Sequence, residues 1–147
     1  MTTEMMTAMA QIGAAAALGL GAAGSALGTG TAGMAAIGAW KKCFAQSKAA
    51  PFILVTFIGA PMSQTIYGFI LMRSMLTADV SNWGLMLGGG LLGGLGIGAS
   101  AWFQGKAGAA GADALAETGQ GFGNYLMTIG VVETVALLVM VFTLISL

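Results

Sequence analysis

The sequence predicts an all-α membrane protein in which four transmembrane helices form two tandem hairpins. Of its 147 residues, 57% are hydrophobic and only 7% are charged, and the mean hydropathy is +0.89. A soluble domain carries roughly 25% charged residues, so this chain has too few to cover a globule with solvated groups. The apolar runs are long and do not alternate apolar with polar residues, which favours helices over the strands of a membrane barrel.

Short polar segments divide the chain into four apolar runs. The first hairpin is expected at 1–76, with spans at about 5–40 and 51–75; the second is expected at 77–147, with spans at about 84–116 and 124–147. The segments KKCFAQSKAAP, TADVSNW and ETGQGFG are expected as the loops. Cys43 then lies in the first loop as an incidental thiol, and Pro51 opens the second span. No room remains for a soluble domain.

Basic residues predict how the chain is oriented in the membrane. Lys41, Lys42 and Lys48 all belong to the first loop, whereas the second loop contains Asp79 and no basic residue. Loops rich in lysine and arginine remain in the cytoplasm, so the first loop is expected there. With four spans, both termini are then expected on the outside.

The two halves resemble each other. Residues 57–71, FIGAPMSQTIYGFIL, align without a gap to residues 128–142, TIGVVETVALLVMVF, and this places Met62 opposite Glu133. Each half also has a span rich in glycine and alanine followed by a span of bulkier residues. We favour a duplicated hairpin in which one copy has lost its carboxylate over two unrelated hairpins of similar composition.

Small residues recur along the first span at intervals of four. A stripe of this kind allows a second helix backbone to approach very closely. The third span is also rich in glycine. Small helices packed inside and large helices outside fit a ring of subunits, whereas close packing within one bundle explains the stripe equally well. The stripe consists of Gly13, Ala17, Gly21, Ser25, Thr29 and Gly33.

Several functions are disfavoured by the composition. The net charge is zero, which argues against nucleic acid as a partner. The chain has no histidine, the commonest metal ligand, and its one cysteine can form neither an internal disulfide nor a thiolate cluster. Two matches to G-x-G-x-x-G lie inside the first span with no preceding strand, so they do not indicate a dinucleotide site.

Glu133 is the candidate functional residue, because it lies within the apolar fourth span. A charge near the centre of a bilayer costs at least about 2.5–3.5 kcal/mol, and such residues are usually functional. The spans offer few polar partners. Ser63, Gln64 and Tyr67 share one side of the second span by their spacing of three and four residues, and the third span offers Gln104.

These groups form a set rich in oxygen with a net charge of −1. Pro61 adds a carbonyl freed from its hydrogen bond in the preceding turn. Hard cations such as Na⁺ prefer oxygen ligands, whereas a buried carboxyl can also become neutral by binding a proton alone. Two glutamines in apolar helices exceed what a proton needs, so they favour a metal cation. Each glutamine taken singly is also explained by a hydrogen bond between helices.

At these residues the sequence resembles a known family, the four-helix proteolipid (the K, or c, subunit) of the membrane rotor of V-type ATPases. The resemblance covers essentially the whole chain, and its most specific elements are PMSQTIYGF, FQGKAGAAG and VVETVALL. Ser63 stands where the sodium-type pattern has threonine and keeps the hydroxyl group. Met62 stands where that pattern has glycine.

The resemblance implies a Na⁺ site in which the ion is carried across the membrane. Its ligands would be the side chains of Ser63, Gln64, Gln104 and Glu133 and the backbone carbonyl of Ala60, and the hydroxyl of Tyr67 would hydrogen-bond the Glu133 carboxylate. Bound Na⁺, or H⁺ in its place, would be the only ligand, with no cofactor.

The same resemblance implies partners and a location. Copies of the chain would form a homo-oligomeric ring in lipid, next to a stator subunit with an arginine and a central-stalk subunit. ATP hydrolysis would take place in other subunits, so no catalytic residue is expected in this chain. The expected location is a prokaryotic-type plasma membrane. Met62 opposite Glu133 would mean one ion for every four helices.

Two other functions remain open from the sequence. In one, the chain is a proton-specific rotor proteolipid in which the polar cluster only hydrogen-bonds Glu133. In the other, which is of a different class, the chain is a small structural or channel-forming membrane protein in which Glu133 holds helices together. Protection of Glu133 from carbodiimide by Na⁺ would separate the first reading from these two.

Overall fold

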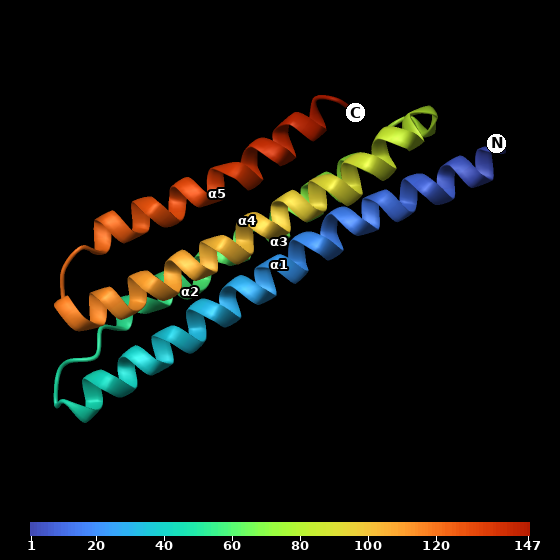
Figure 1. Cartoon of the computed structure of the whole chain (residues 1–147). Helices are drawn as coiled ribbons and strands as arrows, with labels where there is room; N and C mark the ends of the chain where they lie inside the picture. Colours follow the sequence, from blue (N-terminus) through green and yellow to red (C-terminus); the bar gives the residue numbers. More distant parts are fainter.

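The chain is an all-helical bundle, described here by a computed structural model of all 147 residues. Four helical segments are long and apolar enough to cross a membrane, which confirms the predicted fold class. The chain passes along the bundle four times in alternating directions, so both termini and the connection between α3 and α4 lie at one end (Figure 1). The elements are α1 (Thr3–Ala45), η1 (Phe52–Leu54), α2 (Val55–Gly59), η2 (Ala60–Met62), α3 (Ser63–Met75), η3 (Val80–Asn82), α4 (Trp83–Thr118) and α5 (Phe122–Leu144).

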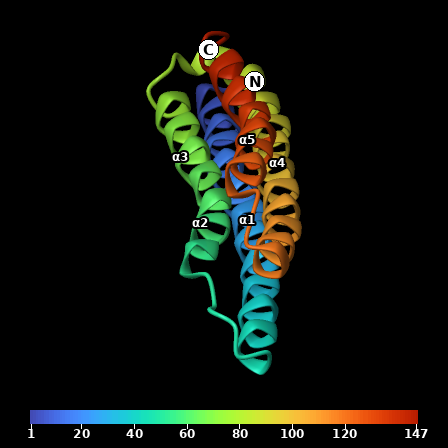
Figure 2. The same cartoon turned by 90° about the vertical axis from the view of Figure 1, so that its left-hand side faces the viewer.

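Helices α1 and α4 form the centre of the bundle and have by far the most extensive mutual contact of any pair. The segment from α2 to α3 packs mainly on α1, and α5 packs mainly on α4; Figure 2 shows these two pairs side by side. The contact between α3 and α5 is much smaller. The two glycine-rich helices are therefore central, and the two helices with bulkier side chains flank them.

Glycine allows the backbones of α1 and α4 to meet directly. A Cβ atom built at Gly24 or Gly90 would overlap the backbone of the opposite helix, so no other residue fits at these positions without moving a helix. Close backbone approach increases dispersion contact along the interface, which is the main attraction available between helices in lipid. The facing pairs are Gly13 with Gly90, Gly24 with Gly98 and Gly28 with Gly105.

The small stripe of α1 follows the true helical period and not strict intervals of four. Its first members are buried within the chain, whereas Thr29 and Gly33 are partly exposed, and Gly28 and Ala32 take their places. An α-helix has 3.6 residues per turn, so steps of four drift around the helix by about 40° each. The stripe thus packs on α4 and α3 of the same chain, which is the bundle interpretation of the small residues.

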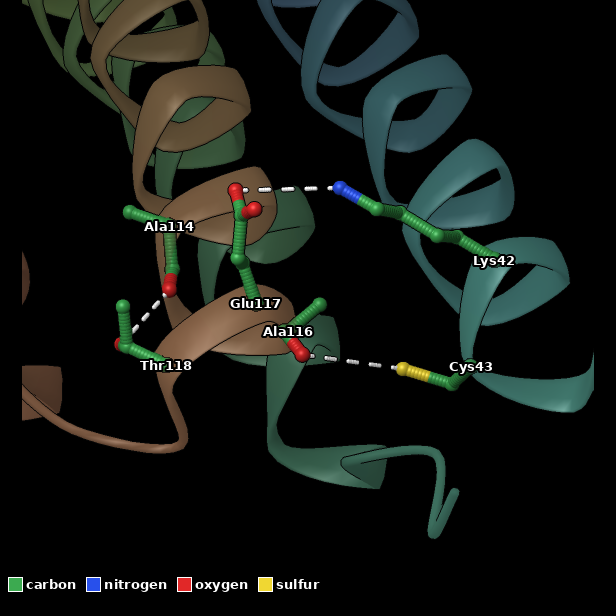
Figure 3. Close-up of polar contacts among 6 residues, drawn as sticks. All are labelled: Lys42, Cys43, Ala114, Ala116, Glu117 and Thr118. Carbon is green, nitrogen blue, oxygen red and sulfur yellow. Dashed lines mark hydrogen bonds and ion pairs between the residues drawn. The ribbon is translucent and has the colours of Figure 1, made fainter. Parts of the chain in front are cut away.

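The first connection is shorter than predicted, because α1 continues to Ala45 and includes Lys41, Lys42 and Cys43. Cys43 is not a loop thiol. It is only 2% exposed, and its Sγ lies 3.8 Å from the carbonyl oxygen of Ala116 on α4 (Figure 3). The hydropathy of the sequence showed where the apolar run ends, at about residue 40. The helix itself continues to Ala45, because polar side chains are compatible with the last turns of a helix.

The ends of α1 and α4 are also joined by an ion pair. Lys42 Nζ lies 3.7 Å from a carboxylate oxygen of Glu117, and both side chains are largely exposed (Figure 3). Glu117 belongs to the last turn of α4, which ends at Thr118, and not to the loop predicted there. With α5 beginning at Phe122, the third connection is reduced to residues 119–121, where Gly119 and Gly121 adopt positive φ angles.

Candidate functional site

Pro61 interrupts the regular helix just before the polar residues of the second span. Proline lacks an N–H group, so it cannot donate to the carbonyl one turn earlier. The helix here tightens into the short η2 turn and resumes as α3 at Ser63. The freed carbonyl is that of Phe57, and a Cβ atom at Gly108 would lie only 3.0 Å from its oxygen, so glycine lets α4 approach at this point.

Ser63, Gln64 and Tyr67 form one polar face at the start of α3. The Ser63 hydroxyl oxygen lies 3.1 Å from the carbonyl oxygen of Ala60 and 3.2 Å from Oε1 of Gln64. Gln64 is fully buried, whereas Ser63 and Tyr67 are partly exposed. Ser63 and Tyr67 thus face Glu133 on α5, whereas the Gln64 side chain beside them reaches Gln104 on α4.

Glu133 meets this face from the middle of α5. Its Oε1 accepts hydrogen bonds from the Ser63 hydroxyl at 2.5 Å and from the Tyr67 hydroxyl at 2.6 Å. Glu133 is the twelfth of the 23 residues of α5, so the carboxylate lies at the centre of a helix about 35 Å long. Such a helix is about as long as the bilayer core is thick, which places the carboxylate near the membrane centre.

Gln104 connects the two flanking helices from α4. Its side chain is fully buried, and its Nε2 donates to Oε2 of Glu133 at 3.1 Å. Its Oε1 accepts a hydrogen bond from Nε2 of Gln64 at 2.6 Å. The structure therefore brings together every residue that the sequence analysis named for the site: Ala60, Ser63, Gln64, Tyr67, Gln104 and Glu133.

One backbone group of the site was missed by the sequence analysis. The carbonyl oxygen of Ile129 accepts a hydrogen bond from Nε2 of Gln104 at 3.3 Å. Ile129 precedes Glu133 by four residues and therefore lies on the same face of α5, which is the signal that could have identified it. One turn away, the hydroxyl of Ser100 donates to the carbonyl of Val132 at 2.8 Å and ties α4 to α5 beside the site.

No cationic side chain of the chain neutralises Glu133. The cationic residue closest in sequence to Gln104 is Lys106. Its side chain is exposed, and its Nζ lies 4.3 Å from the centroid of the Trp102 ring. The only ion pair of the structure joins Lys42 to Glu117 at the end of the bundle. The chain also has no group of three or more histidine, cysteine or acidic residues that could hold a metal ion. The carboxylate is held by neutral donors alone.

The arrangement can hold one small charged species. The carboxylate supplies a negative charge, and hydroxyl, amide and carbonyl oxygens gather around it from three helices. A single proton or a single monovalent cation would make this site neutral. The chemistry that this arrangement supports is the reversible binding of such a species.

Comparison with known proteins supports the same kind of molecule. Residues 87–146 match the family model that describes the C subunit of ATP synthase. The matched segment contains most of α4 and all of α5, and so includes Gln104 and Glu133. A search of curated proteins gave no significant match. The match covers less than half of the chain, and it shows that the segment with Gln104 and Glu133 resembles a rotor proteolipid of the c-subunit type.

Proposed function

We propose that this proteolipid of the c-subunit type is the ion-carrying component of the rotor ring of a V-type rotary ATPase, and that it carries Na⁺ on Glu133. The observation that carries the proposal is the set of contacts at the carboxylate. Side chains from α3 and α4 converge on Glu133 in the middle of an apolar helix, with distances of 2.5–3.1 Å. A structural carboxyl group needs fewer partners than this.

The proposed Na⁺ ligands are the carboxylate of Glu133, the hydroxyl of Ser63, the amide oxygens of Gln64 and Gln104, and the carbonyl of Ala60. All are oxygen atoms, which hard cations prefer. Tyr67 is not a ligand in this scheme and holds the carboxylate by its hydrogen bond. One bound monovalent cation cancels the one negative charge.

Loading the ion requires a small rearrangement of hydrogen-bond donors. The hydroxyl of Ser63 and the amide nitrogen of Gln104 face the carboxylate and donate to it. A cation beside Glu133 needs oxygen lone pairs at these positions. The Ser63 hydroxyl hydrogen would therefore rotate away, and the Gln104 amide would make a half-turn about its last side-chain bond, which breaks its hydrogen bond with Nε2 of Gln64. Both changes are rotations of single side-chain bonds.

The mechanism follows from the cost of a charge in lipid. Copies of the chain would form a homo-oligomeric ring, and a stator subunit with an arginine would lie next to it. Glu133 would take up its ion opposite the stator, cross the lipid in the neutral form, and release the ion near the arginine. ATP would be hydrolysed elsewhere, and a central-stalk subunit would turn the ring. Met62, opposite Glu133 in the alignment of the two halves, leaves one ion for each chain.

The orientation in the membrane is part of the same proposal. The end of the bundle with Lys41, Lys42 and Lys48 would face the cytoplasm, because basic residues remain there. Both termini share the opposite end and would lie outside (Figure 1). The ion pair between Lys42 and Glu117 would then lie in the cytoplasmic region. We also propose that the two hairpins arose by duplication; the ion site does not depend on this.

A proton-specific rotor is the second candidate, and one observation favours it. Ser63, Tyr67 and Gln104 all donate hydrogen bonds to the carboxyl group, so neutral groups of the chain already occupy its oxygen atoms. A proton on Glu133 would neutralise such a network equally well. The two candidates share the ring and the carrier residue, and they differ only in the ion.

Carbodiimide labelling of Glu133 tests the proposal and separates the candidates. Carbodiimide reacts with the protonated carboxyl group. Bound Na⁺ should therefore protect Glu133 from labelling, and less Na⁺ should be needed at higher pH, where fewer protons compete for the site. Labelling that follows pH alone would select the proton carrier. Glu133→Gln is the control, since it should abolish both labelling and Na⁺ binding. A ring that labels at Glu133 but moves neither ion in reconstituted vesicles would contradict both carrier functions.

A further inference from the structure

Ser25 has a buried hydroxyl group with no hydrogen-bond partner. The residue is 5% exposed, and its Oγ is the only buried side-chain oxygen or nitrogen of the chain that lacks a partner. A serine within a helix can usually donate to the carbonyl one turn earlier. Thr29, one turn later, does so, with a distance of 2.8 Å to the Ser25 carbonyl oxygen. The Ser25 hydroxyl is turned away from this local bond, and an unsatisfied buried polar group costs about 1–3 kcal/mol.

Ser25 lies on the face of α1 that meets α3 and α4. Two glycines on the same face of α1 bracket it. A Cβ atom at Gly21 would lie 3.1 Å from the backbone oxygen of Gln64, and one at Gly28 would lie 2.7 Å from Cβ of Pro61. Ser25 falls between these two levels and therefore packs beside the first turn of α3, which carries Gln64.

Gln64 has an unfilled donor in the same region. Its side chain is fully buried, so water from outside cannot satisfy it. One N–H of its Nε2 donates to Gln104, and its Oε1 lies 3.2 Å from the Ser63 hydroxyl oxygen. An amide nitrogen carries two N–H groups, and the second one has no acceptor within the chain. A fully buried donor and a buried hydroxyl thus lie in one junction of helices, outside direct hydrogen-bond distance of each other.

We propose that a buried water molecule bridges Nε2 of Gln64 and the hydroxyl of Ser25. A water at this point would accept from the second N–H of Gln64 and would donate to the Ser25 oxygen. Buried waters usually bind at least two otherwise unsatisfied polar groups, as this one does. The water fixes the plane of the Gln64 amide, so that its oxygen stays directed at the Ser63 hydroxyl. Ser25 is therefore a positioning residue, and its effect on Na⁺ rests on the proposed function.

The water itself is tested by an experimental structure of the assembled ring at a resolution that shows ordered solvent. A solvent peak within about 3.2 Å of both the Ser25 hydroxyl and the Gln64 amide nitrogen supports the proposal. Ser25→Ala should remove that peak, whereas Thr29→Val should keep it, because the Thr29 hydroxyl is satisfied within its own helix. Well-resolved side chains with no peak between them would overturn the proposal, whether or not the ring binds Na⁺.

The positioning effect is tested by the Na⁺ concentration that gives half-maximal protection of Glu133 from carbodiimide, measured at several pH values. Ser25→Ala should raise this concentration about 2- to 10-fold, the loss expected for one hydrogen bond. The control Thr29→Val should leave it unchanged. The dependence of labelling on pH without Na⁺ should stay as in the native ring, because Ser25 does not touch the carboxylate.

The outcomes separate this inference from the function on which it rests. If Na⁺ fails to protect the native ring, the proposed Na⁺ function is wrong. The solvent peak in the experimental structure then remains the test of the bridging water. If Na⁺ protects the native ring and Ser25→Ala matches it, the positioning effect is wrong. An equal shift in Thr29→Val would also overturn it, since the change would then come from the packing of α1.

Discussion

Replacing Gln104 with leucine should weaken Na⁺ binding strongly while the bundle stays intact. Gln104 is fully buried and makes three hydrogen bonds: it accepts one from Gln64 at 2.6 Å, and it donates one to Glu133 at 3.1 Å and one to Ile129 at 3.3 Å. Leucine has a similar volume and suits an apolar helix, so the packing of α4 is preserved. The polar contacts are lost together.

The size of the effect follows from these contacts. The variant removes a partner of the charged carboxylate, and it leaves Nε2 of Gln64 without its acceptor in a fully buried position. Loss of a hydrogen bond to a charged group, or of one partner of a buried pair, costs about 1–3 kcal/mol. This corresponds to a rise of about 5- to 150-fold in the Na⁺ concentration that half-protects Glu133.

The assay is carbodiimide labelling of purified rings across Na⁺ concentrations at fixed pH, after confirming that the variant runs as the native oligomer in mild detergent. Ser100→Ala is the matched control. Ser100 lies one turn from Gln104 on α4 and also hydrogen-bonds the backbone of α5, at the Val132 carbonyl, but it does not touch the carboxylate. The control should stay within about 2-fold of the native ring. Native Na⁺ protection in Gln104→Leu, or an equal loss in Ser100→Ala, would refute the reasoning.

Three further predictions follow from contacts described above. Tyr67→Phe should weaken Na⁺ protection less than Gln104→Leu does, because it loosens the Glu133 carboxylate without removing a proposed ligand; a larger loss would make the Tyr67 hydroxyl a ligand. Gly24→Leu should destabilise the bundle by at least about 1–3 kcal/mol and lower the yield of folded chain, because its side chain would enter the backbone of α4. Gly19→Leu is the control, since a Cβ atom there meets nothing within 4 Å, and equal yields of oligomer from both variants would contradict the packing. A cysteine placed at Lys48, in a chain without the native thiol, should react with a membrane-impermeant maleimide in inverted vesicles but not in intact cells; the reverse would overturn the proposed orientation.

The side chains of the site could be predicted from the sequence because each is expensive in lipid. Ser63, Gln64 and Tyr67 share a face by their spacing alone, and that face meets Gln104 and Glu133 in the structure. Polar side chains buried in an apolar bundle need hydrogen-bond partners, and the few other polar side chains are the ones available. The same argument does not reach backbone carbonyls, which are present at every residue, and for that reason the carbonyl that accepts from Gln104 was missed.

The ends of the helices and the register in which α1 packs on α4 could not be predicted from the polar residues. Hydropathy separates apolar from polar segments, but a helix with charged residues in its last turn continues past that boundary, as α1 does to Ala45. Counting small residues in steps of four identified the face of α1 only near its start. The true face was set by where the glycines of α4 allow contact, such as Gly98 opposite Gly24.

The partner of α1 also has a consequence for how the protein is made. The glycine face of α1 packs mainly on α4, a helix that the ribosome completes only after α2 and α3. When the first two spans have entered the membrane, that face still borders lipid, and a smooth glycine surface gains little contact from mobile acyl chains. The first hairpin alone therefore lacks the larger part of the interface of α1. Insertion of the third span, which forms α4, supplies that interface.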